Sequence, residues 1–238
     1  METIEVRNIP VDIVRKDIKN VHVAVYPPDG RVRISVPKGM SKRAVRLAIV
    51  DKLIWIRRQQ EELEAQPRQT EREMVSGENH YVWGERKLLK VRTHDGPNRV
   101  CLQGAKTIEM YVSPDADAER RYTILQEWYR SELKARIPQI ISVWQPKVGV
   151  KVDDWGVRKM KTNWGSCTIQ DGRIWINLEL AKKPLACLKY IVVHEMTHLL
   201  ERHHNDRFRA HLDRVMPNWR LYRKELNAAP LAHEDWDY

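Results

Sequence analysis

Three residues carry the strongest chemical signal in this sequence of 238 residues, and they are His194, Glu195 and His198. In a helix, side chains at positions i and i+4 lie on one face, so the two imidazoles can reach the same metal ion. Zinc held in this way lowers the pKa of a bound water to about 7, and a neighbouring carboxylate can take the proton of that water. The pattern therefore predicts zinc-dependent hydrolysis with Glu195 as the general base.

A catalytic zinc site needs a third protein ligand and an open position for the reacting molecule. His204 follows His198 by six residues, a spacing at which the chain beyond the helix end can return to the same ion. We therefore expect His204 to be the third ligand. His203 is the first alternative, and Glu201 is the second if the helix continues further.

The residues next to these candidates have weaker signals. Asn205 or Asp206 could accept the free N–H of a ligand imidazole, or could equally belong to a solvated loop. Ser166 and Cys167 resemble nucleophiles, yet the sequence places no base beside them in a recognisable way. We interpret Gly165 as permitting close packing near the site and Cys167 as a buried thiol.

Composition limits the class of protein. Hydrophobic residues make up 42% of the chain and the mean hydropathy is −0.61, which is typical of globular proteins. No apolar run reaches the roughly 18 residues that a membrane-spanning helix needs. Residues 1–20 lack the pattern of a secretory signal, so a cytoplasmic location and no membrane partner are expected. Three scattered cysteines predict neither a disulfide framework nor a thiolate zinc site.

The chain is basic, with a formal net charge of +10 and a pI near 9.6. Clustered Lys and Arg would favour a polyanion as partner. Here 42 basic residues are interleaved with 32 acidic ones along the whole chain, a pattern more typical of a solvated surface. Nucleic acid is therefore an optional partner, and no feature of the sequence indicates an oligomeric state.

The N-terminal region, placed at residues 1–113, is predicted to be β-rich with one helix. Apolar residues alternate on both sides of a Pro-Pro-Asp-Gly turn, which predicts a hairpin over residues 21–36. Ser41 is then expected to cap a helix that covers this hairpin. The polar residues 57–74 are interpreted as a solvated helix end followed by a connector, in which a domain seam could lie. A small meandering sheet is expected from the β-like segments 80–83, 87–92 and 108–112.

The C-terminal region, residues 114–238, is predicted to be the hydrolase. Large apolar residues recur every three or four positions over residues 117–143, which predicts a long amphipathic helix. A hairpin turn is expected at Asp171 and Gly172. Pro184 is at a position typical of a helix start, and that helix carries the histidine pair. Two short strands are expected, at residues 148–152 and 174–177. The predicted fold class is α+β.

Four short motifs follow one another in this region: Asn163-Trp164-Gly165-Ser166-Cys167, Trp175-Ile176-Asn177-Leu178, Tyr190 to Glu195 with His198, and His204-Asn205 followed by Phe208. Their order and spacing resemble those of the YgjP-like, SprT-related family of metal-dependent hydrolases. The resemblance extends to the N-terminal hairpin and helix, with Val36-Pro37-Lys38-Gly39 and Trp55-Ile56.

This resemblance implies a zincin-like metallopeptidase half with an active-site helix. It also implies that His194, His198 and His204 bind the metal and that Glu195 is the base. The sequence departs from the family's usual pattern at Asn163, where the family often has Arg, and at Asn205, where it often has Ser.

Hydrolysis of a peptide or protein substrate is the leading functional hypothesis. A strand beside the active-site helix would align an extended substrate, and residues 173–177 are the candidate. The basic side chains considered for stabilising the developing negative charge are Lys159, Lys161, Arg173 and Arg202.

Two other classes of function remain open. A nucleotide pyrophosphatase would suit the basic balance of the chain, since cationic groups assist phosphoryl transfer. The sequence has, however, no phosphate-binding glycine loop and no carboxylate cluster for magnesium. A non-enzymatic zinc module that binds nucleic acid or protein would need a closed site with four ligands, and Glu195 would have no purpose in it.

Overall fold

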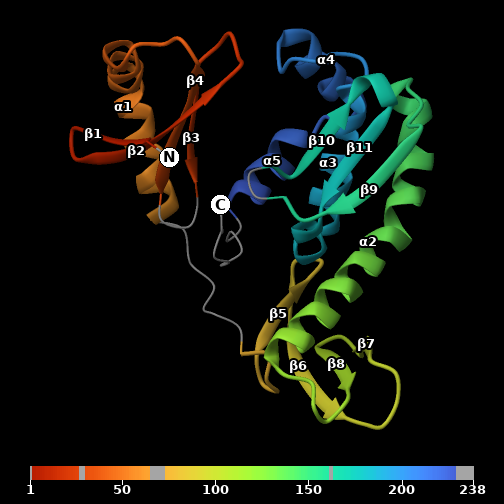
Figure 1. The fold of residues 1–238 in the computed structure, drawn as a ribbon. Coiled ribbons are helices and arrows are strands. Elements are labelled where there is room, and N and C mark those ends of the chain that lie inside the picture. The colour runs from red at the N-terminus through yellow and green to blue at the C-terminus, as the bar shows by residue number, and fades with distance from the viewer. Residues whose placement is uncertain (1, 27–29, 65–72, 161–162, 229–238) are drawn as a thin grey trace. The chain divides into compact units, whose positions relative to one another are not determined.

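The computed structural model describes residues 2–26, 30–64, 73–160 and 163–228 (Figure 1). The chain forms two compact units that divide between residues 71 and 72, within the stretch interpreted as a connector. Residues 73–113 are thereby grouped with the C-terminal region, and the predicted boundary at residue 113 stays a prediction. The fold class is α+β, as expected. No helix in the described ranges is both long and apolar enough to cross a membrane.

The first unit is a four-stranded sheet with one helix. The sheet order is β1-β2-β4-β3, and the strands are β1 (Glu2–Val6), β2 (Ile9–Lys16), β3 (His22–Tyr26) and β4 (Arg31–Pro37). The predicted hairpin is confirmed by the antiparallel pairing of β3 with β4. The hairpin of β1 and β2 was not expected, because its turn is formed by Arg7 and Asn8 with φ of 51° and 66° and lacks the glycine that usually signals such turns.

Helix α1 (Lys42–Glu64) covers this sheet, as predicted. The Ser41 Oγ accepts a hydrogen bond of 3.2 Å from the Ala44 N–H, which confirms the cap. Apolar side chains of the helix and of β4 form one buried cluster, which includes Val45, Ile49 and Ile56 together with Val32, Ile34 and Val36.

The second unit begins with a small sheet of order β5-β6-β8-β7. Its strands are β5 (Asn79–Val82), β6 (Glu85–Thr93), β7 (Arg99–Gln103) and β8 (Thr107–Val112). The three expected segments are strands, while β7 is an additional edge strand. Strands β6 and β8 are parallel neighbours, so the connectivity departs from a simple meander at this point.

Helix α2 (Ala118–Val148) is the predicted long helix, and it joins the small sheet to the rest of the unit (Figure 1). Asp117 caps its start by accepting a hydrogen bond of 2.8 Å from the Arg120 N–H. The strand predicted over residues 148–152 is wrong, because the helix continues to Val148 and ends at Gly149, with φ of 82°. Alternating valines gave the false signal, whereas glycine in the left-handed region marks a helix end.

The sheet nearest the histidine pair has the order β10-β11-β9. Its strands are β9 (Asp154–Arg158), β10 (Gly165–Thr168) and β11 (Arg173–Asn177), and the short helices η1 (Ile169–Asp171) and η2 (Leu178–Lys182) flank β11. The predicted Asp171-Gly172 turn joins β10 to β11, with Gly172 at φ of 55°. Strand β11 lies in the middle, so its backbone is paired on both sides and β10 forms the edge.

Three helices complete the unit: α3 (Leu185–Thr197), α4 (Asp206–Val215) and α5 (Trp219–Ala228). Helix α3 packs on β10 and β11, where Leu188 and Val192 join Ile174 and Ile176 in the core. Helices α4 and α5 were not predicted. Each is short and highly charged, so the apolar residues that fix them, among them Phe208 and Leu226, are few.

Candidate metal centre

Helix α3 positions the histidine pair as the spacing predicts. Pro184 precedes its first turn, and the helix ends at Thr197. His198 is the C-cap residue and keeps helical angles, with φ of −64° and ψ of −19°, so the i to i+4 geometry of the pair is preserved. The imidazoles of His194 and His198 therefore lie side by side, with ring centroids 4.9 Å apart.

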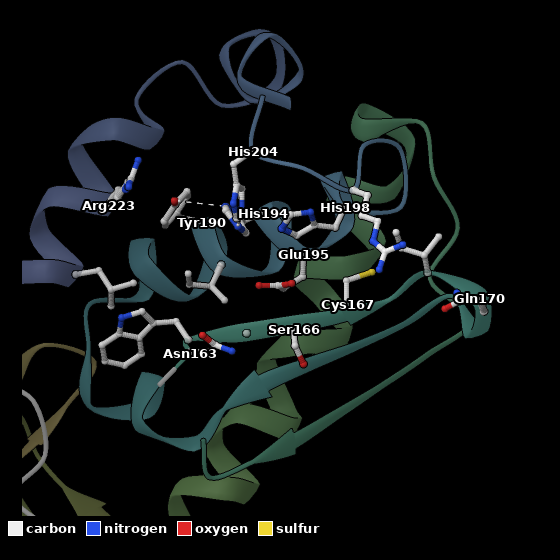
Figure 2. A pocket seen from close by; sticks show the side chains of 16 residues that line it. Asn163, Ser166, Cys167, Gln170, Tyr190, His194, Glu195, His198, His204 and Arg223 are labelled. Atoms are coloured by element: carbon white, nitrogen blue, oxygen red, sulfur yellow. Dashed lines mark hydrogen bonds between the residues drawn. The ribbon is translucent and has the colours of Figure 1, made fainter. Parts of the chain in front are cut away.

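His204 returns to this pair from the turn before α4. Its Nε2 lies 2.9 Å from the Nε2 of His194, and one nitrogen from each of the three imidazoles lies within 4.8 Å of the others. The three imidazoles point toward one another in Figure 2. The alternatives lie elsewhere, since Glu201 interacts with Arg207 at 4.0 Å and His203 is exposed outside the cavity.

Phe208 packs against the imidazoles of His194, His198 and His204. Its ring centroid lies 4.7–4.9 Å from the centroids of all three imidazoles, and the residue is only 2% exposed. Asn205 accepts a hydrogen bond of 3.0 Å from the Phe208 N–H and so caps α4. Asp206 pairs with Arg209 at 2.6 Å. Of the two possibilities given by the sequence, contact with a ligand imidazole is not seen for either residue among the described contacts. The contribution of Phe208 was missed, although it follows His204 at helical spacing.

Two other groups contact the second nitrogens of the imidazoles. The Tyr190 hydroxyl lies 3.5 Å from the Nδ1 of His194, and the Glu201 carbonyl oxygen lies 3.2 Å from the Nδ1 of His198. Such contacts fix the ring orientation and leave Nε2 available to a cation. Tyr190 precedes His194 by one helical turn, so its spacing was the signal that could have identified it.

The protonation of the imidazoles suits a cation. Burial, together with smaller contributions from the nearby His198 and His204, lowers the pKa of His194 to about 3. Burial is also the main reason that the pKa values of His198 and His204 are lowered. Neutral imidazoles are the form that binds metals. Three such donors with nitrogens this close together fit a zinc ion, whose ligand nitrogens lie about 2.0–2.1 Å from the metal.

Glu195 lies directly beside the cluster. The residue is 4% exposed, and burial raises the pKa of its carboxyl to about 8. It packs so tightly against β10 that a Cβ built on Gly165 would lie 2.5 Å from its Oε1. The predicted close packing at Gly165 is confirmed. A buried carboxylate without a counter-charge is costly, so a cation held by the imidazoles would complete this arrangement.

The three histidines, Glu195 and Gly165 line one cavity of about 770 Å³. Its other walls include Cys167 of β10 and Arg223 of α5, together with Asn163 before β10 and Arg202 after α3. Cys167 is half-buried on the cavity wall rather than fully buried, and burial raises the pKa of its thiol to about 11. Ser166 points away from the histidines (Figure 2), and its Oγ accepts a hydrogen bond of 3.1 Å from Arg158.

The remaining charged candidates separate into two groups. Arg202 lines the cavity, whereas Lys159 and Arg173 do not. Lys159 donates a hydrogen bond of 3.2 Å to the Tyr122 hydroxyl, and Arg173 pairs with Asp154. Lys161 lies outside the described residues. Arg223 was not considered from the sequence, because no motif marks it and only the packing of α5 brings it to the cavity.

Comparison with known proteins gives the following findings. A solved structure described as the metallopeptidase zymogen of Pyrococcus abyssi abylysin is 15% identical, with a TM-score of 0.35 over 40% of this chain and 99% of that chain. No curated protein matches the chain. Residues 19–229 match the family described as YgjP-like, metallopeptidase domain. This match spans most of both compact units, and the chain belongs to the YgjP-like family.

Proposed function

We propose that this chain is a zinc-dependent peptidase in which His194, His198 and His204 hold the ion. Glu195 is its general base. The observation that carries the proposal is the convergence of three neutral imidazoles beside a buried carboxylate, on the wall of an open cavity. The family match to a metallopeptidase domain supports a hydrolase of this class.

When bound, a zinc ion would act as a Lewis acid and would lower the pKa of a water molecule to about 7. The carboxylate of Glu195 accepts the proton of the attacking water and later gives that proton to the nitrogen of the leaving amine. Tyr190 and the Glu201 carbonyl keep the imidazoles of His194 and His198 in orientation. The close contact with Gly165 fixes the carboxylate against β10, so the base has one position relative to the substrate.

Strand β10 is the element that we expect to align the substrate. It forms one edge of the sheet β10-β11-β9, and its residues line the cavity next to Glu195. An extended peptide can add to such an edge through backbone hydrogen bonds. The strand favoured from the sequence, residues 173–177, is β11, which cannot serve in this way because both of its edges are paired.

The test measures metal content and hydrolysis of an unfolded protein for the native chain and four variants. Glu195→Gln should keep one zinc and lose activity by about 10²–10⁴-fold, the range for loss of a general base. His194→Ala and His204→Ala should lose the metal. His203→Ala is the matched control, because this neighbouring histidine is exposed and should leave both properties unchanged. Activity that survives Glu195→Gln would contradict the mechanism.

A second candidate function is nucleotide pyrophosphatase activity, and one observation favours it. Arg202 and Arg223 both line the cavity and could bind a polyphosphate. Against it, Glu195 is the only acidic residue among the described residues that line the cavity, so a carboxylate cluster for magnesium is lacking there. The same preparations assayed with nucleoside triphosphates distinguish the two activities.

The structural zinc module is less well supported. The candidate group has three protein donors among the described residues, whereas a closed structural site has four. A zinc ion held by four protein ligands, together with no hydrolysis of either substrate class, would favour this function instead.

A further inference from the structure

Arg223 is a cationic side chain on the cavity wall that the proposed mechanism does not use. It comes from α5 and lies on the Tyr190 side of the cavity, opposite Gln170 (Figure 2). The three histidines proposed to hold the ion, His194, His198 and His204, line the same cavity as Arg223.

Arg223 has no ion pair with any described residue, in contrast to three arginines of α4 and α5. Arg209 pairs with Asp206 at 2.6 Å, Arg207 approaches Glu201 at 4.0 Å, and Arg220 pairs with Asp213. No hydrogen bond joins its guanidinium to another described residue either, and an arginine of this kind on a cavity wall is suited to a carboxylate, which can accept two parallel hydrogen bonds from it.

Helix α5 holds Arg223 in place. Trp219, one turn before it, is 5% exposed and stacks on Tyr190 of α3, with ring centroids 6.2 Å apart and an interplanar angle of 16°. Leu226, on the same face, is 2% exposed and also lines the cavity. The backbone that carries Arg223 is thus fixed on both sides, which keeps the side chain of Arg223 on this wall of the cavity.

We propose that Arg223 is a specificity-determining residue that binds a carboxylate of the peptide substrate beside the scissile bond. This inference rests on the proposed peptidase function and names its substrate class. The carboxylate can come from an Asp or Glu side chain or from the C-terminus of the peptide. The cavity favours either source, because Arg202 adds a second positive charge and Glu195 is the only acidic residue among its described lining residues.

The experiment measures kcat/KM of the zinc-loaded native chain for matched peptides. One set carries Glu or Gln at each position near the cleaved bond, and the other has a free or an amidated C-terminus. We expect at least about tenfold preference for one carboxylate, the scale of a charge-assisted contact, and a smaller preference at high salt. Arg223→Gln should reduce the preference to near unity, and Arg223→Glu should favour Lys over Glu at the same position.

Lys224→Gln is the matched control, because Lys224 is an exposed neighbour on α5 that does not line the cavity. It should keep the preference of the native chain. Two results would overturn the inference while leaving the peptidase function intact: cleavage without a carboxylate preference, or a preference that survives Arg223→Gln. No cleavage of any peptide, with hydrolysis of nucleoside triphosphates that depends on Arg223, would overturn both proposals and assign the guanidinium to a phosphate.

Discussion

Replacing Gly165 by Ala tests the contact between β10 and the candidate general base. A Cβ at this position would lie 2.5 Å from the Oε1 of Glu195 and 2.7 Å from its Cγ. The φ of Gly165 lies outside the left-handed region, so the backbone itself accepts alanine. Any effect of Gly165→Ala therefore comes from the displaced carboxylate or the displaced strand.

The magnitude follows from the distances. Ordinary contacts of a Cβ begin at 3.4 Å, so one side must move by about 1 Å to relieve the 2.5 Å approach. A misplacement of this size at a reacting centre costs about 100-fold in rate. Overpacking in a buried site costs about 1–3 kcal/mol in the free energy of unfolding. The three imidazoles lie outside this contact, so zinc content should be unchanged.

The assay compares kcat/KM, zinc content and denaturant unfolding of Gly165→Ala with the native chain. Gly39→Ala is the control, because a Cβ there meets no atom within 4 Å. We expect the large loss in kcat/KM only for Gly165→Ala, with both proteins keeping their metal. Full activity of Gly165→Ala would refute the close approach of β10 to Glu195, and loss of zinc would mean that the strand also supports the histidines.

Three further predictions concern other parts of the second unit. Tyr190→Phe removes the hydroxyl beside His194 but keeps the ring that stacks on Trp219, so zinc affinity measured against a competing chelator should fall about tenfold or more while the unfolding transition stays the same. Zinc at a free concentration of 100 times its Kd adds about 2.7 kcal/mol to the free energy of unfolding, so its removal should lower the Tm of the native chain. The Tm of His204→Ala should not change when zinc is removed. Burial lowers the pKa of Lys183 from 10.5 to about 8, so the unfolded chain binds more protons between these pH values and native stability rises with pH there. Lys183→Met should accordingly be more stable at pH 7 by up to about 3 kcal/mol, an advantage that disappears by pH 10.5 in urea unfolding; a difference independent of pH would contradict this.

Local patterns predicted the parts of the fold that depend on near neighbours. The histidine pair, the Ser41 cap and the Asp171-Gly172 turn depend on spacings of a few residues, and each lies where the sequence places it. The wrong predictions concern segments whose secondary structure depends on contacts with residues far away in the sequence. The valines over residues 148–152 alternate as in a strand, yet the packing of Val148 against the core extends α2 to Gly149.

The candidate site divides in the same way. Glu195 and the three histidines were predicted from their spacing and from the family resemblance. Arg223 could not be predicted, because α5 is brought to the cavity by its packing on α3, which includes the stacking of Trp219 on Tyr190. The edge position of β10 could not be predicted either, since sequence alone does not tell which strand of a sheet lies at its edge.

The position of His204 shows why the third histidine could be predicted although its supporting helix was not. Asn205 caps α4 through the Phe208 N–H, and this cap fixes Phe208 one turn beyond His204. The buried Phe208 ring then contacts all three imidazoles, so the start of α4 and the histidine cluster form one packed group. The departure from the family's frequent Ser at residue 205 preserves this arrangement, because Asn and Ser are both strong helix caps. Residue 205 therefore needs a side chain that caps α4, because this cap places Phe208 against His204. A contact of residue 205 with the metal or the substrate is not needed for this role.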